Sequence, residues 1–134
     1  MKNSIIVILT TFIILAANVF ADPNTSVNTP VPTFTFSVSP GKTINSGENI
    51  TFNSVITVFT RGKIMQTLII HDSDNHSVIL KNMSKEIGQG IGTYKSAFSF
   101  SFPKGMSPGK YPVTSQILLD NIVVTSKIML LELK

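Results

Sequence analysis

Two histidines and two aspartates lie close together in one short stretch, and they are the side chains with which this chain could hold a metal ion. The stretch reads IIHDSDNHSVIL and contains both histidines, His71 and His76, with Asp72 and Asp74 between them. Facing residues on paired strands lie about 5 Å apart, so the two histidines could meet across a hairpin and share zinc or copper. Two histidines and one aspartate are an incomplete ligand set, however, and the chain has no cysteine to complete it. The residues between the histidines are turn formers, which predicts a turn between two strands and no metal site.

The scarcity of histidine also argues against hydrolytic catalysis. A serine nucleophile needs a base that a third group holds in place, and the only histidines are the two in this turn. The glycines of GQGIG, residues 88–92, lack the lysine and the following helix of a phosphate loop. The remaining acidic residues stand singly, so they offer no carboxylate pair for acid–base chemistry; they are Asp22, Glu48, Glu86, Asp120 and Glu132. We therefore predict a protein that is not an enzyme and that uses no cofactor.

The first residues have the pattern of a secretory signal peptide. Lys2 is followed by the apolar run Ile5–Ala17, and Val19 and Ala21 stand at the small-residue positions of a cleavage site. The alternative is a retained membrane anchor, because the apolar run approaches the length of a short span. We predict a signal peptide at 1–21, a flexible proline-bearing lead-in at 22–32 and one domain at 33–134. The protein would then be secreted, lumenal in the secretory–lysosomal pathway, or periplasmic in a bacterium.

The charged residues do not point to nucleic acid. The formal net charge is +4, but the lysines are scattered, whereas a nucleic-acid binder needs a basic stripe with interleaved aromatics. A transient contact with an anionic membrane surface stays open. Four N-x-S/T sequons fit a secreted glycoprotein; they begin at Asn24, Asn49, Asn75 and Asn82.

The elements that must position any site are short strands. Apolar and polar residues alternate in seven runs, and no window of ten residues favours a helix. The runs cover residues 33–39, 50–59, 64–71, 77–80, 93–103, 111–119 and 122–133, and the segments 40–49 and 81–92 are expected to be connections. Asp120-Asn121 suits a tight hairpin turn, and the hydroxyl of Tyr111 could bond back to the main chain as a corner tyrosine. This pattern predicts an all-β fold, an immunoglobulin-like antiparallel β-sandwich of about seven strands.

One region resembles a known family. Phe102-Pro103-Lys104, followed by Pro108-Gly109-Lys110-Tyr111 and an alternating strand, resembles the C-terminal half of the ML-domain lipid-recognition family. That family includes secreted phosphatidylglycerol/phosphatidylinositol transfer proteins and the Niemann-Pick type C sterol carrier. Upstream, Ser39-Pro40 and Gly47-Glu48-Asn49 are similar to the family's pattern. The chain departs from it in lacking every cysteine, with Ser126 at or near the place of one.

The resemblance implies a lipid carrier that holds a sterol or phospholipid between its two sheets without catalysis. The residues that would line the cavity are the inward-facing Ile56, Val58, Leu68, Ile70, Phe98, Phe100, Val113, Ile117 and Leu119. Three methionines near turns would form an adaptable rim; they are Met65, Met83 and Met106. The same inward positions would equally form an ordinary filled core. The alternative function is therefore a secreted structural or adhesive module with a closed core, which binds a protein partner through its edges or loops.

Overall fold

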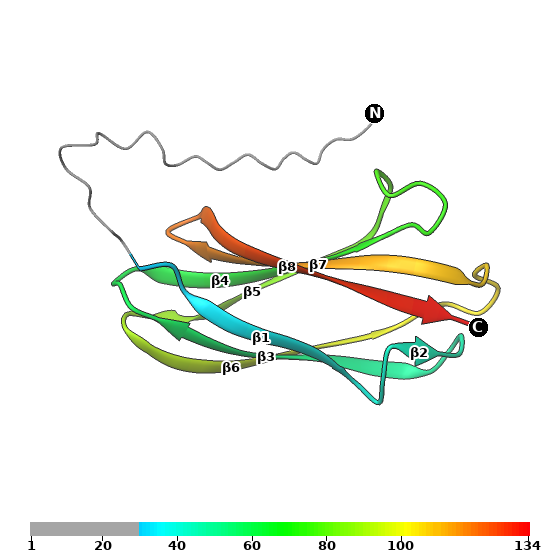
Figure 1. Cartoon of the computed structure of the whole chain (residues 1–134), viewed down its shortest axis with the longest axis horizontal. Coiled ribbons are helices and arrows are strands. Elements are labelled where there is room, and N and C mark those ends of the chain that lie inside the picture. Colours follow the sequence, from blue (N-terminus) through cyan, green and yellow to red (C-terminus); the bar gives the residue numbers. More distant parts are fainter. Residues whose placement is uncertain (1–29) are drawn as a thin grey trace.

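In the computed structural model, residues 30–134 are described, and they form two β-sheets packed face to face (Figure 1). The predicted signal peptide and most of the predicted lead-in, including Asn24, lie outside the described residues. Strands β1, β3 and β6 form one sheet, and β2, β8, β7, β4 and β5 form the other, in that order. The strands are β1 (Thr33–Ser39), β2 (Thr43–Ile44), β3 (Asn49–Val58), β4 (Lys63–His71), β5 (Ile79–Gln89), β6 (Gly92–Ser101), β7 (Gly109–Leu119) and β8 (Ile122–Leu133). The predicted all-β, immunoglobulin-like sandwich is confirmed.

All neighbouring strands pair antiparallel except β2, which runs parallel to β8. The predicted hairpin is present, because Leu119 faces Ile122 and the two residues between them take the left-handed conformation, with φ of 49° and 69°. The predicted corner tyrosine is also confirmed. The hydroxyl of Tyr111 donates a hydrogen bond to the main-chain carbonyl of Ser107, just before β7.

Two strands were not predicted correctly. Residues 81–89 belong to the edge strand β5 and are not a connection. Their inward face mixes lysine with apolar residues, so the expected alternation of apolar and polar positions is missing. The segment 40–49, expected to be a turn, contains the two-residue strand β2. This strand carries the chain from one sheet to the other, and its Ile44 is buried in the core.

The core is divided into two apolar clusters by a layer of polar side chains. One cluster surrounds Phe52 and Tyr111, and the other surrounds Phe34 and Ile117. At the boundary, six strands each place one polar residue on the inward face. This polar layer consists of Ser54, Gln66, Lys85, Ser96, Ser115 and Lys127.

The amide of Gln66 is at the centre of the polar layer. Its Nε2 donates hydrogen bonds to Ser54 Oγ at 2.9 Å and to Ser115 Oγ at 2.8 Å, which joins the two sheets. Gln66 Oε1 and Ser96 Oγ are buried and have no hydrogen-bond partner among residues 30–134. Buried polar groups are normally paired, so this layer is stabilised only in part.

Candidate functional site

The histidine stretch forms the predicted turn. Strand β4 ends at His71 and β5 begins at Ile79, and the backbone N–H of Asp72 donates to the carbonyl of Val78 at 2.9 Å. Within the turn, Asp72 Oδ2 accepts hydrogen bonds from the backbone N–H groups of Asp74 and Asn75, at 3.1 and 3.0 Å. The carboxylate therefore organises its own loop, as aspartate commonly does in turns.

Both ring nitrogens of His71 are engaged by the protein. Nδ1 donates to the carbonyl of His76 at 2.9 Å, and Nε2 accepts from the hydroxyl of Thr114 at 3.1 Å. Burial lowers the pKa of His71 below its ordinary value of 6.5, while the hydrogen bond to the His76 carbonyl opposes this shift. In the described part of the chain, no group of three or more His, Cys, Asp or Glu side chains could hold a metal ion. The hairpin thus uses its polar atoms for its own structure.

The candidate site lies instead along one side of the sandwich, between an edge strand of one sheet and an edge strand of the other. Strands β5 and β6 are edge strands of different sheets and face each other there. We call the line between them the seam. A groove of about 540 Å³ opens at one end of the seam. It is lined by Asn49, Leu80, Lys81, Ser99, Phe100, Ser101, Phe102, Pro103 and Met106.

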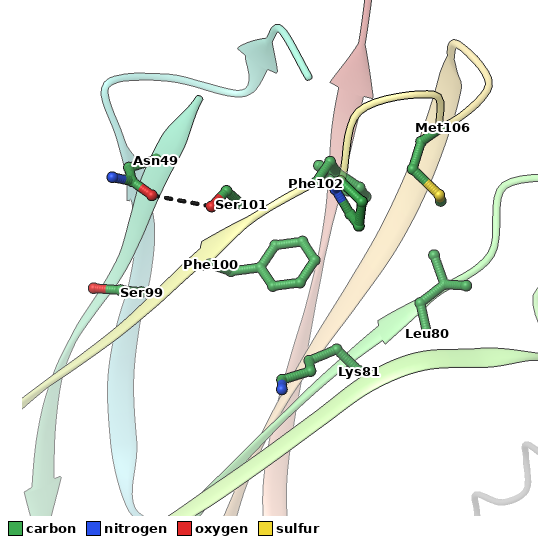
Figure 2. A pocket seen from close by; sticks show the side chains of 9 residues that line it. Asn49, Leu80, Lys81, Ser99, Phe100, Ser101, Phe102 and Met106 are labelled. Atoms are coloured by element: carbon green, nitrogen blue, oxygen red, sulfur yellow. Dashed lines mark hydrogen bonds between the residues drawn. The ribbon is translucent and has the colours of Figure 1, made fainter. Parts of the chain in front are cut away.

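Phe100 is the central apolar side chain of this groove. It follows the inward-facing Phe98 on β6 and meets Phe102 edge to face, with ring centroids 5.0 Å apart. Figure 2 shows its ring directed from β6 toward Leu80 and Lys81 on β5, with Met106 nearby. Phe100 is only partly buried, because no strand covers it on the seam side.

The remainder of the seam is closed by two side chains. At the end far from the groove, Tyr94 of β6 donates its hydroxyl to the carbonyls of Gln89 and Gly90, at 2.8 and 3.0 Å. In the middle, the ammonium of Lys85 donates to the carbonyl of Ala97 and lies 4.5 Å from the ring centroid of Phe98. The seam is therefore closed at Tyr94 and at Lys85 and is open around Phe100.

The predicted lining residues all face inward, but most of them belong to the filled core. Seven are buried and pack in the two clusters; they are Ile56, Val58, Leu68, Ile70, Phe98, Val113 and Ile117. Leu119 is partly buried at the edge of the second cluster. Phe100 is the one predicted lining residue that borders the groove.

The three methionines predicted for the rim have separate locations. Met106 lines the groove, and Met83 packs against the first apolar cluster. Met65 pairs with Leu118, and strand alternation places both on the outer face of the five-stranded sheet, away from the seam. Proximity to a turn was therefore a poor guide, because a strand residue's face is decided by its position in the alternation.

Sequence reasoning missed Leu80, Lys81 and Asn49 as groove residues. Leu80 and Lys81 were placed at the boundary between a strand and a supposed connection. Asn49 was singled out only as a sequon; it now borders the groove, where its Oδ1 accepts from Ser101 Oγ at 3.0 Å (Figure 2). The sequon residues Asn49, Asn75 and Asn82 are all exposed. An alternation extended through 79–87 would have put Lys81, Met83 and Lys85 on one face.

Comparison with known proteins identifies only the fold. No protein-family model matches the chain, and no curated protein matches it in sequence. The chain is similar in structure to part of the alkylpurine DNA glycosylase AlkC of Pseudomonas fluorescens, with a TM-score of 0.52 and 17% identity. That match covers 77% of this chain and 30% of the glycosylase.

Two further solved structures show the same sandwich. A β-glucosidase from Listeria innocua matches with a TM-score of 0.52 and 16% identity, over 77% of this chain and 16% of the enzyme. The CARDB domain of a Pyrococcus furiosus protein, in complex with di-metal ions, matches with a TM-score of 0.51 and 10% identity, over 77% of this chain and 94% of that domain. This chain therefore spans under a third of either enzyme, and such low identities establish a shared fold alone. Residues 30–134 contain no helix long and apolar enough to cross a membrane.

Proposed function

We propose that the protein is a non-catalytic lipid-binding module, and that its lipid is held at the groove end of the seam. The observation that carries this proposal is the position of Phe100. It faces inward with the core residues of β6, yet it is left partly uncovered opposite Leu80 and Met106. A phenylalanine on the inward face of a sheet is normally covered by other side chains. An inward-facing phenylalanine that stays partly uncovered is therefore a candidate ligand contact.

The size and chemistry of the groove suit an amphipathic ligand. Its volume of about 540 Å³ falls within the roughly 300–1,000 Å³ usual for small-molecule sites. Phe100, Phe102, Leu80 and Met106 provide the apolar surface, and methionine repacks readily around different shapes. Lys81 and Asn49 supply polar atoms at the same groove. The apolar chain of the ligand would lie on these four apolar side chains, and its polar headgroup would face Lys81 and Asn49.

The energetics require the seam to open further when the lipid binds. A buried methylene contributes about 0.8 kcal/mol. An acyl chain of about twelve carbons that lies in the groove with one side in water would gain about half of what the fully buried chain would gain. That gain, about 5 kcal/mol, lies near the lower limit of the association cost of about 4–15 kcal/mol, so it leaves little or no net affinity. The start of β5 would therefore move away from β6 and let the chain insert beside Phe98. Lys85, rather than a ladder of backbone hydrogen bonds, holds the two strands together there.

Membership of the ML-domain lipid-recognition family is part of this proposal. It is supported by the Pro-Gly-Lys-Tyr turn into β7 and by the sandwich. Secretion, with removal of residues 1–21 and sugars on the exposed sequons, is proposed with it. N-terminal analysis of the protein released by its host would test the removal of residues 1–21, and its intact mass would show whether sugars are attached.

The decisive experiment is native mass spectrometry of the folded protein, offered cholesterol and a palmitoyl-oleoyl phosphatidylcholine separately. We expect a one-to-one adduct with at least one of them. Leu80→Asp should abolish the adduct, because it places a charge on the apolar wall of the groove. Val55→Asp is the matched control, since Val55 is 39% exposed and Leu80 is 36% exposed, and Val55 lies on the outer face of β3.

Two results would overturn the proposal. One is the absence of an adduct with either lipid in a protein that circular dichroism shows to be folded. The other is an adduct that survives Leu80→Asp and Phe100→Ser unchanged, which would place any lipid elsewhere.

A second function is favoured by a different observation. Ile128 and Leu130 are exposed on the outer face of the five-stranded sheet, opposite Thr114 and Pro112 of β7. An apolar patch on an outer sheet face can mark a protein contact, which would suit the alternative of an adhesive module with a closed core. Crosslinking in the native secretion, lost in Ile128→Lys but kept in Leu80→Asp, would favour this function over the lipid carrier.

A further inference from the structure

Three turns and the start of the first strand come together at one end of the sandwich. The turns between β3 and β4, between β5 and β6, and between β7 and β8 all lie at the end where β1 begins, on the left in Figure 1. We call this the β1 end. The opposite end holds the histidine turn, the groove and the C-terminus (Figure 1).

Hydrogen bonds join these three turns into one surface. The backbone N–H of Gly90 donates to the carbonyl of Gly62 at 3.1 Å, which links the β5–β6 turn to the β3–β4 turn. The backbone N–H of Asp120 donates to the carbonyl of Lys63 at 2.9 Å, and Asp120 Oδ1 accepts from the N–H of Lys63 at 2.9 Å. The β7–β8 turn is thereby fixed to the same central segment.

Each of these turns exposes a large apolar side chain to solvent. Phe59 is 44% exposed, Ile91 65% and Ile122 67%, and Val31, just before β1, is also exposed. At the opposite end, the β4–β5 turn also exposes apolar residues, Val78 at 45% and Ile79 at 52%. The other turns there have polar residues at their tips; examples are Lys42, Ser46 and Lys104. Exposed leucine or isoleucine residues are ordinary when scattered, but here every turn of one end carries one.

Basic residues lie among the apolar tips. A shallow hollow of about 450 Å³ is lined by Arg61, Gly62, Lys63, Gln89, Gly90 and Asp120. The two cations Arg61 and Lys63 outnumber the single carboxylate of Asp120, so the hollow carries a net positive charge. This arrangement is complementary to the surface of an anionic bilayer. The apolar side chains would reach the acyl-chain boundary, and the cations would lie at the level of the phosphates.

The direction of the chain supports the same occupant. The apolar run Ile5–Ala17 precedes the fold, and the chain joins the sandwich at the β1 end. The fifteen residues between this run and Thr33 reach at most about 50 Å when extended. A membrane that held the run would therefore be tethered to the sandwich through Thr33, at the β1 end.

We propose that the β1 end is a membrane-docking surface, in which Phe59, Ile91 and Ile122 insert among the headgroups of an anionic bilayer while Arg61 and Lys63 face its phosphates. The proposal does not rest on the groove, which opens at the opposite end and stays accessible from water when the protein is docked. If residues 1–21 are removed, the apolar tips and the basic hollow alone carry the proposal.

The chain has no tryptophan, so a single introduced tryptophan reports on one position. We would place it by Ile91→Trp at the β1 end and by Ser46→Trp at the opposite end. Vesicles of phosphatidylcholine with phosphatidylglycerol should shift the emission of the Ile91→Trp protein to shorter wavelength. Brominated phosphatidylcholine should then quench this emission, and the Ser46→Trp protein should show neither change. This comparison measures which end meets the bilayer, even in a chain that is also anchored through Ile5–Ala17.

Charge and tip variants complete the test. Arg61→Glu should weaken binding to the anionic vesicles by roughly fivefold or more. Ile122→Asp should weaken binding to phosphatidylcholine vesicles both with and without phosphatidylglycerol. Leu80→Asp, which should abolish lipid uptake in the groove, should leave vesicle docking unchanged, so the two proposals can fail separately. The docking proposal is overturned if tryptophan at position 91 is unaffected by vesicles, or if tryptophan at position 46 responds equally.

Discussion

The ring of Tyr94 lies directly against Gly88, on the neighbouring edge strand across the seam. A Cβ on Gly88 would come within 2.4 Å of Tyr94 Cε1, closer than any side chain tolerates. The absence of a side chain therefore lets the ring cross to β5 and donate its hydroxyl to the carbonyls of Gln89 and Gly90. This contact closes the seam at the end opposite the groove.

The first prediction is that Gly88→Ala destabilises the fold by about 1–3 kcal/mol, the usual cost of adding atoms to a packed site. The new methyl group would displace the Tyr94 ring and weaken its two hydrogen bonds. Urea denaturation followed by circular dichroism would measure the change.

Gly41→Ala is the control for this substitution, because no atom lies within 4 Å of the added Cβ; its effect should stay within about 0.5 kcal/mol. In a Tyr94→Leu background, Gly88→Ala should cost clearly less, since the clashing ring is gone. Equal costs in both backgrounds would show that the ring is not the cause.

The second prediction concerns the polar layer between the two apolar clusters. Ser115→Ala leaves one N–H of the Gln66 amide without an acceptor, so it should cost about 1–3 kcal/mol. The triple variant Ser54→Ala, Gln66→Leu, Ser115→Ala removes both partners and also the unpaired Gln66 Oε1. Replacing all partners with apolar groups is often nearly neutral, so we expect the triple variant to be more stable than Ser115→Ala alone. A triple variant as unstable as the sum of its single changes would show that the layer itself stabilises the sandwich.

The third prediction is a loss of stability in mild acid that depends on His71. Burial lowers the pKa of this histidine in the folded state below the 6.5 of the unfolded chain. The unfolded state therefore binds more protons as the pH falls, so stability is complete above about pH 6.5 and is lost as the pH passes through the folded-state pKa. Comparing urea midpoints at about pH 7.5 and about pH 5, the wild type should lose more stability than His71→Gln.

The exposed His76 provides the control for the pH effect. His76→Gln keeps the main-chain carbonyl that accepts from His71 Nδ1. It removes only the charge repulsion from His76, a smaller cause of the lowered pKa of His71 than burial, so its pH dependence should be slightly weaker than that of the wild type and stronger than that of His71→Gln. If His71→Gln and the wild type lose equal stability between the two pH values, the carboxylates and not His71 cause the acid sensitivity.

The alternation of residues was sufficient to predict most of the sandwich. In β1, β3, β6, β7 and β8, the predicted runs differ from the observed strands by two residues or fewer at either end. β5 was predicted only at its first two residues, 79–80. The remainder was taken for a connection because β5 is an edge strand at the seam, where Lys81 and Lys85 can face inward and still reach water. Such a strand does not alternate between apolar and polar residues, so periodicity cannot detect it.

The groove could not be predicted from the same signals. Phe98 and Phe100 have the same type, the same face and the same strand, yet Phe98 is buried and Phe100 borders the groove. The difference arises from β5, since Lys85 covers Phe98 while Leu80 and Lys81 leave space beside Phe100. Which inward residues stay uncovered depends on how two edge strands of different sheets diverge, and local sequence does not encode that distance.

The last prediction is that Lys85 keeps the edge of β6 from pairing with another chain. Its ammonium occupies the carbonyl of Ala97, which β6 presents on the side away from β3. Edge strands with free backbone groups pair with one another, and lysine on or near the edge is a common protection. We expect Lys85→Met to sediment as a larger species than the wild type at the same protein concentration. Lys127→Met is a matched control, because Lys127 also faces inward in the polar layer and lies 5.3 Å from the ring centroid of Phe34. Phe34 belongs to β1, which is the opposite edge of the three-stranded sheet from β6. If both variants sediment alike, the loss of a charge and not the exposed edge would explain any association.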